Sequence, residues 1–267
     1  MRRFNTKRFN GKFTPLDNNI DKLVAFTPSL DKNWRDNQQI KSKPYQVETL
    51  DAVRQFQDEG WKIKGSYQNR EKSNRISSHF IKMEHPDLVI RNDKGQREAL
   101  ANVLISNSCS GTKPMTLDVG AFRMVCSNGL YSMGSISHAA IKHNEKNQHH
   151  LPEIIGNFNL KTSGVLEEFK KLKEVQLSPY QRSELAFKAA GLRFGDDVNF
   201  DVEQLLNSHR KEDEGDSLWS VYNRIQENLT QSNLLIDRNG NLIRGINDVK
   251  DDVKVNQQLF ELVHELV

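Results

Sequence analysis

Hydrophobic and polar positions follow distinct patterns in successive parts of the chain. Residues 1–45 are polar and interrupted by prolines, with single aromatic residues spaced among basic and amide side chains. That pattern predicts a basic extended arm. Residues 46–267 carry the periodic apolar positions of a folded chain, and we expect a single α+β domain there. A sub-boundary near residues 151–164 is also considered.

Strand-like patterns dominate the N-terminal half after the arm. Apolar and polar residues alternate over residues 61–67 and 78–83, and apolar segments occupy residues 100–105 and 121–126. Turn-forming residues separate these segments, which favours antiparallel pairing of consecutive strands over a doubly wound parallel sheet. A short helix that ends at Gly60 precedes the first strand.

Helical spacing dominates the C-terminal half. Helices are predicted within residues 154–206, over residues 217–229 and over residues 259–267. A small β-hairpin is predicted over residues 234–244, turning at the Asn-Gly dipeptide. The fold class is therefore α+β: an antiparallel β-sheet from the N-terminal half packed with helices, and a mostly helical C-terminal half with a small β-hairpin.

Net charge excludes a polycationic protein but leaves local basic clusters. The chain of 267 residues has 38 Lys and Arg against 35 Asp and Glu, a net charge of +3. Five basic residues and no acidic residue lie within residues 1–13. Any electrostatic attraction to nucleic acid must therefore come from local clustering.

Several features favour a cytoplasmic protein. The basic N-terminal segment is not followed by the apolar stretch of a signal peptide, and no apolar run approaches the roughly 20 residues of a membrane-spanning helix. The two cysteines, Cys109 and Cys126, are expected to be free thiols. We expect no association with membranes.

Enzymatic motifs are absent from the sequence. It holds no phosphate-binding glycine loop and no nucleophile elbow. Cys126 would need a neighbouring base to act as a nucleophile, and a small buried hydrophobic residue is the favoured interpretation. The cluster of His138, His143, His149 and His150 lacks a recognised ligand spacing. We therefore expect no metal and no cofactor, and a non-enzyme rather than an enzyme.

Basic residues interleaved with aromatic residues suggest a nucleic-acid surface. Lys and Arg neutralise phosphates while rings stack on bases, the combination used by sequence-tolerant single-strand binders. The alternative without a binding role is an ordinary solvated strand face, on which Lys62 and Lys64 point outward while Trp61 and Ile63 pack inward. The candidates are Arg2, Arg3, Phe4, Lys7, Arg8, Lys12, Lys62, Lys64, Tyr67, Arg70, Lys72, Arg75 and Arg123.

The polar side of the helix predicted over residues 217–229 is richer in hydrogen-bonding groups than packing requires. Arg224, Gln226 and Glu227 are candidates for a buried polar network or for a site, and the network is the favoured use.

Several segments together resemble a known family. They are Arg3-Phe-Asn5, Phe26-Thr-Pro-Ser29, Ile105-Ser-Asn-Ser108, Gly120-Ala-Phe-Arg-Met-Val-Cys-Ser-Asn-Gly-Leu130 and Asp216-Ser-Leu-Trp-Ser-Val-Tyr-Asn-Arg-Ile-Gln-Glu-Asn228. With them the chain resembles domain of unknown function 932, an uncharacterised phage and plasmid family, from residue 2 to Asn256. The resemblance implies a bacterial host and genes for DNA maintenance, recombination or evasion of host defence. It transfers no catalytic residue.

Three functional hypotheses follow from these observations. The first is a nucleic-acid-associated protein of a mobile genetic element (phage, prophage or plasmid) that binds or anneals DNA, single-stranded rather than double-stranded. The second is an enzyme acting on nucleic acid, with Cys126, His138 and His143 in one pocket. The third is a protein-interaction module that inhibits host defence. A homo-oligomer is compatible with each of them.

Overall fold

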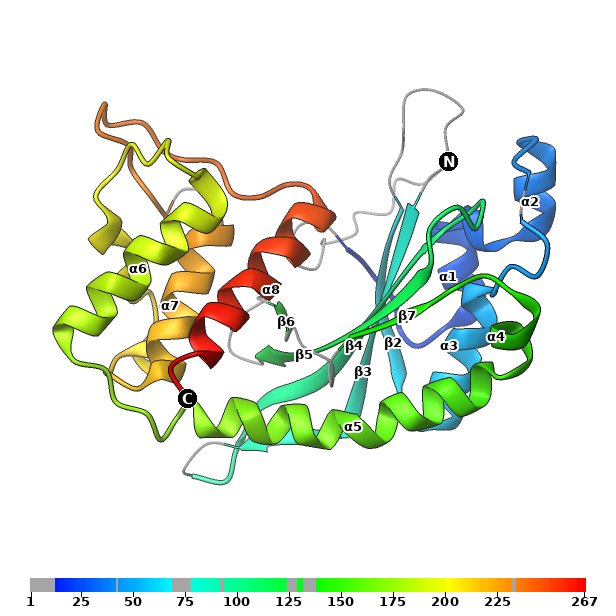
Figure 1. Cartoon of the computed structure of the whole chain (residues 1–267), viewed down its shortest axis with the longest axis horizontal. Helices are drawn as coiled ribbons and strands as arrows, with labels where there is room; N and C mark the ends of the chain where they lie inside the picture. The colour runs from blue at the N-terminus through cyan, green and yellow to red at the C-terminus, as the bar shows by residue number, and fades with distance from the viewer. Residues whose placement is uncertain are drawn as a thin grey trace. The chain divides into compact units, whose positions relative to one another are not determined.

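The computed structural model describes residues 13–41, 43–68, 78–91, 94–123, 129–131, 138–231 and 234–267. The chain divides into two compact units (Figure 1). The first holds Met1–Gly129 and Gly134–Leu166, and the second holds Leu130–Met133 and Glu167–Val267. The boundary between Leu166 and Glu167 lies just after the sub-boundary considered at residues 151–164.

The first unit is built on an antiparallel sheet. Its strands β1, β2, β3, β4 and β5 neighbour one another in that order, and β7 also pairs with β5; only Gly129 of the short β6 belongs to this unit. The strands are β1 (Thr14–Pro15), β2 (Lys62–Gln68), β3 (Ser78–Arg91), β4 (Arg97–Ser108), β5 (Met115–Arg123), β6 (Gly129–Tyr131) and β7 (His138–Ile141). The order of β2 to β5 follows the sequence, as short local connections favour.

Helices surround one side of this sheet. They are α1 (Ile20–Phe26), the short 3₁₀ helix η1 (Pro28–Leu30), α2 (Lys32–Asn37), α3 (Thr49–Asp58), α4 (Glu145–His149) and α5 (Leu151–Lys171). Both α1 and α3 pack against β2, and Figure 1 shows them beside the sheet. Trp61 makes edge-to-face ring contact with Phe56 of α3 and donates a hydrogen bond to Asn159 of α5. Both Trp61 and Phe56 are fully buried.

Pairing between strands assigns their side chains to two faces. Ile81 of β3 lies opposite Ile105 of β4, which in turn lies opposite Leu117 of β5, and all three are fully buried. Because side chains on a strand alternate between faces, the residues between these positions point to the other side of the sheet. One irregularity occurs in β2 at Lys64, where a bulge interrupts the register with β3.

Helices α1 and α2 form within residues 1–45, where an extended arm was predicted. Asn19 accepts a hydrogen bond from the backbone N–H of Lys22 and so caps α1, while Asp31 accepts one from Asn33 and caps α2. Such caps satisfy backbone donors that a helix leaves unpaired at its start. The proline-rich composition of residues 1–45 concealed these short helices, whose apolar positions are few.

The second unit is mainly helical. Its elements are α6 (Pro179–Phe194), the 3₁₀ helices η2 (Val202–Leu206) and η3 (Lys211–Asp213), α7 (Leu218–Thr230) and α8 (Val249–His264). Ser178 and Gln181 form a capping box at the start of α6. Ser217 caps α7, as its sequence predicted.

Helix α7 is the core of the second unit. Almost all of its side chains are buried, including Val221, Tyr222 and Ile225. Tyr222 makes ring contacts with Trp219 and with Phe260 of α8, and burial raises the pKa of its hydroxyl. A helix buried on nearly every side fits the interior of a helical unit.

The α+β fold predicted from the sequence is confirmed. The predicted strands are found, although β3 and β4 extend further and β5 begins earlier, at Met115. The predicted hairpin is reduced to one bridge between Ile236 and Leu242, and α8 begins ten residues before the predicted start at residue 259. No helix among the described residues is long and apolar enough to cross a membrane.

Packing of α1 on the sheet can be tested by one leucine substitution with a matched control. Leu23 of α1 is completely buried, whereas Leu160 of α5 is 79% exposed. We predict that Leu23→Ala lowers the free energy of unfolding by about 2–5 kcal/mol, because it removes buried methyl groups and leaves a cavity. Leu160→Ala should change it by less than about 0.5 kcal/mol. Denaturant titration of both variants measures the difference, and equal midpoints would contradict the packing of α1.

Candidate nucleic-acid interface

The side of the sheet opposite α1 and α3 carries many polar and aromatic residues, and we call it the polar face. The register places on it residues that lie opposite one another on neighbouring strands, with Lys64 reaching it from the bulge. Its members are Lys62, Lys64, Tyr67, Phe80, Lys82, Glu84, Asn102, Ser106, Thr116, Asp118 and His138. It unites described residues from five strand segments that are far apart in sequence.

Two of the predicted lysines lie at the β2 edge of the polar face. Lys62 is exposed and lies opposite Glu84 of β3. The Lys64 ammonium lies 3.4 Å from a Glu84 carboxylate oxygen, and its side chain is 42% exposed. Trp61 and Ile63 are buried, so the inward and outward alternation expected for this strand is present. This alternation agrees with the solvated-face interpretation and leaves Lys62 and part of Lys64 accessible to solvent.

An aromatic group adjoins these lysines. The ring of Tyr67 lies 6.3 Å from that of Phe13 and 6.1 Å from that of Phe80, between centroids. Phe13 and Phe80 are buried, whereas Tyr67 is half-buried. A tyrosine held between two rings has little freedom to lose when a flat partner stacks on it.

A carboxylate–imidazole pair lies at the other edge of the face. Asp118 is buried, and its Oδ1 lies 2.7 Å from Nδ1 of the more exposed His138 on β7. Its Oδ2 accepts a hydrogen bond from the Thr116 hydroxyl. The hydrogen bond to Asp118 raises the pKa of His138. His138 is therefore positively charged up to a higher pH than an ordinary histidine.

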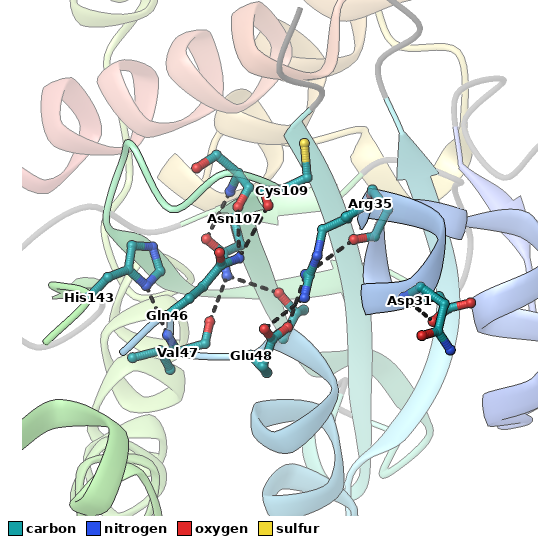
Figure 2. Close-up of polar contacts among 12 residues, drawn as sticks. Asp31, Arg35, Gln46, Val47, Glu48, Asn107, Cys109 and His143 are labelled. Carbon is teal, nitrogen blue, oxygen red and sulfur yellow. Dashed lines mark hydrogen bonds and ion pairs between the residues drawn. The ribbon is translucent and has the colours of Figure 1, made fainter. Parts of the chain in front are cut away.

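A buried polar cluster occupies the helix side of the same sheet, and Figure 2 shows its members. Arg35 of α2 points toward Glu48, and the two make a bidentate pair with distances of 2.7 and 3.0 Å. Arg35 is almost completely buried and also donates to the Ser29 carbonyl. Glu48 precedes the first residue of α3, so the pair links α2 to the start of α3.

His79 of β3 lies at the centre of this cluster. Its Nδ1 is 2.9 Å from the Ser29 hydroxyl and its Nε2 is 2.7 Å from the Thr49 hydroxyl. Asn107, opposite His79 on β4, donates to the same Thr49 hydroxyl and to the Val47 carbonyl. Burial, together with the positive charge of Arg35, lowers the pKa of His79 to about 3. The imidazole is thus neutral at physiological pH, and its visible role is to join helices to strands.

His143 belongs to the edge of the buried cluster. The Val47 N–H donates to its Nδ1, and its Nε2 lies 2.8 Å from the Lys113 carbonyl oxygen, so Nε2 carries the proton. Burial lowers the pKa of His143. Gly111 has a positive φ and little room for a side chain, because Gln46 and His143 lie 3.3 Å from the position of a Cβ. Both ring nitrogens of His143 are occupied by structural partners.

The other predicted residues are distributed as follows. Arg2, Arg3, Phe4, Lys7, Arg8, Lys12, Arg70, Lys72, Arg75 and Cys126 lie outside the described residues. The backbone of Arg123 pairs with Ala99, and its side chain is not described. His149 and His150 are exposed. Of the three residues in the enzyme hypothesis, the structure describes His138 and His143. His138 pairs with Asp118, whereas His143 contacts the Lys113 carbonyl oxygen and the Val47 N–H.

The residues of the predicted polar network bind separate partners in the second unit. Arg224 donates to the Gly215 carbonyl, and the Gln226 amide donates to the Asn256 side chain. Glu227 forms an ion pair with Arg210. Among the described residues, no cluster of three or more His, Cys, Asp or Glu side chains could hold a metal ion.

Sequence reasoning missed the interior of the polar face. Lys82, Asn102 and Asp118 lie in segments whose neighbours are strongly apolar, and they point to the second face only because of the strand register. A usable signal was present, since Lys82 and Glu84 in β3 and Asn102 and Ser106 in β4 fall at alternate positions between apolar residues, whereas strands covered on both faces are almost continuously hydrophobic.

Comparison with known proteins gives a family without a described activity. A family model described as domain of unknown function (DUF932) matches residues 39–260. The UPF0380 proteins YfjQ and YafZ of Escherichia coli (strain K12) are each 27% identical to the chain over 257 residues. Each alignment covers 92% of this chain and 90% of the relative. No solved structure matches the chain significantly.

The buried His79 predicts a dependence of stability on pH. Its pKa is about 3 in the folded protein, below its value of 6.5 in the unfolded chain, so the unfolded chain binds more protons between these values. Stability from this group is complete above the unfolded pKa and is lost as the pH falls. We predict that the free energy of unfolding decreases by about 2 kcal/mol from pH 7 to pH 5 through His79. Denaturant titrations of wild type and His79→Gln measure this, and equal losses in both would contradict it.

Proposed function

The chain belongs to the family of domain of unknown function 932, and from that premise we propose that it is a nucleic-acid-associated protein of a mobile genetic element that binds single-stranded DNA on its polar face. One observation carries the proposal: Lys62, Lys64 and Tyr67 share this face of β2, and Tyr67 lies between two other rings. Cations beside a stacking ring are what a flexible single strand requires.

Charge on the polar face favours a polyanion. Lys82, Glu84 and Asp118 of this face are buried, whereas Lys62 is exposed and Lys64 is partly exposed, so these two lysines are the ones that a strand can reach. Glu84 is paired with Lys64, and Asp118 is paired with His138. Exposed Lys62 thus has no described acidic partner within ion-pair distance, and it is the strongest single candidate for a phosphate contact.

Stacking favours a single strand over a duplex. The faces of bases are covered in a double helix, whereas an unpaired base presents its face to a ring. Tyr67 lies on a strand, and its orientation is restricted by Phe13 and Phe80. A duplex would contact the lysines alone and would lose the contribution of the aromatic group.

The N-terminal arm extends the proposed surface. Phe13, the first described residue, lies beside Tyr67, and β1 pairs with β2 immediately afterwards. We therefore extend the proposal to the basic residues that precede Phe13 in the sequence. Arg2, Arg3, Lys7, Arg8 and Lys12 would add phosphate contacts.

Salt-dependent binding tests this function with a charge-matched control. We predict that the intact protein binds a fluorescent single-stranded oligonucleotide at roughly 50 mM salt and that affinity falls steeply as salt rises. Lys62→Ala should weaken binding and make the slope of log affinity against log salt shallower by about 0.7, the value for a single phosphate contact. Arg54→Ala, which removes one exposed charge from α3 on the other side of the sheet, should leave the slope unchanged.

Removal of residues 2–12 tests the arm in the same assay. Affinity should fall, and the slope should become shallower by about 0.7 for each phosphate that the arm neutralises. Equal slopes for wild type and the truncated protein would exclude the arm from the surface. Absence of measurable DNA binding by the intact protein at low salt would reject the proposed function and favour the protein-interaction hypothesis.

A further inference from the structure

Two opposed polar residues in the middle of the polar face lack the partners that buried groups normally have. Asn102 of β4 and Glu84 of β3 lie directly opposite each other in the antiparallel register. Asn102 is completely buried, and Glu84 is 4% exposed. Directly opposed residues have Cβ atoms about 5 Å apart, so both side chains border one small region of the face.

Neither side chain satisfies its hydrogen-bonding capacity within the described chain. Both the amide nitrogen and the amide oxygen of Asn102 are buried without a partner there, and so is Oε1 of Glu84. The other Glu84 oxygen pairs with Lys64. A buried polar group without a partner costs about 1–3 kcal/mol, so three such atoms at one place require a physical explanation.

A second asparagine on the same strand shows that the fold can satisfy such a residue. Asn107 points to the helix side, and its amide donates to the Val47 carbonyl and the Thr49 hydroxyl. On the polar face, the residue of β5 opposite Asn102 is Gly120, which has no side-chain atom to pair with the amide. The chain therefore supplies an amide and a carboxylate at this place but no complementary group between them.

The unpaired atoms define the chemistry of a missing partner. Asn102 offers an amide nitrogen with two N–H groups and one acceptor oxygen, and Glu84 offers an additional acceptor oxygen. We propose that Asn102 and Glu84 bind the edge of a nucleobase on which an exocyclic amine adjoins a ring nitrogen, as in adenine and cytosine. The ring nitrogen accepts from the Asn102 amide nitrogen, and the two amine hydrogens go to the Asn102 oxygen and to Glu84 Oε1.

Thymine does not fit this set of partners. Its pairing edge offers one N–H and carbonyl oxygens, so it can pair with the asparagine but has no second N–H for Glu84. A carbonyl oxygen would then lie near the carboxylate, and one buried acceptor would stay unpaired. An asparagine amide that pairs with adenine on two atoms is a common contact in base recognition.

The base site adjoins the proposed strand-binding surface. Lys64 pairs with Glu84, and its partly exposed side chain connects the buried pair to the surface at the β2 edge. When the base belongs to a DNA strand, this inference rests on the proposed function, because the strand is then the ligand. A free nucleotide carries the same edge, so the two sources are tested separately.

Asn102→Leu is the decisive variant, because it should affect binding and stability in opposite ways. Homopolymers of dA, dC and dT, and free dAMP, dCMP and dTMP, are titrated against wild type and variant by calorimetry. Wild type should prefer dA and dC over dT by roughly tenfold, as expected for one bidentate base contact. The variant should lose this preference while it melts at the same or a higher temperature, because leucine removes an unpaired buried amide.

Asn107→Leu is the matched control for stability, since it removes an amide with partners and should lower the melting temperature. Glu84→Gln keeps the shape of the side chain and should reduce the preference without abolishing binding of dT. Equal affinity for all three homopolymers, with the lysine-dependent salt slope intact, would overturn the base site. The proposed function would still stand, and only an internal water would then lie between Asn102 and Glu84. Binding of dAMP and dCMP without binding of any strand would overturn the proposed function and support the site.

Discussion

The unbroken antiparallel register between the first half of β3 and the second half of β4 is the constraint on which the first unit depends. Residues 78–84 lie opposite residues 102–108 without a bulge, and β5 continues the same register from Asn102 onward. Because side chains alternate with a period of two, a slip of one residue would turn His79 away from the helices and bring Glu84 toward them. Helix packing and the polar face therefore depend on one another.

Hydrogen bonds on the helix side specify that register. His79 and Asn107 are opposite each other and both contact the Thr49 hydroxyl at the first residue of α3. The Arg35–Glu48 pair then joins α2 to the same helix start. Neutral His79 requires no counterion, so the sheet and helices are connected by directional bonds in an otherwise apolar layer. A rigid layer behind the sheet keeps Tyr67 and Lys62 in fixed positions on the other face.

Local patterns in the sequence predicted much of the fold and little of the site. The Ser217 cap and the spacing of Leu218, Val221 and Ile225 predicted α7, and alternation predicted β2. The interior of the polar face was not predictable, because Asn102 and Asp118 become neighbours of β3 and β7 residues only through pairing between distant segments. Helices α1 and α2 were missed since each is short and is specified mainly by a cap.

Photochemical cross-linking measures directly whether single-stranded DNA lies on the polar face. A strand that carries 5-iodouracil is irradiated in complex with the intact protein, and the cross-linked peptides are identified by mass spectrometry. Stacking on Tyr67 predicts cross-links in the peptide that contains β2, and their loss in Tyr67→Leu. Cross-links confined to α6 and α7 of the second unit, with none in β2, would contradict binding of the strand on the polar face.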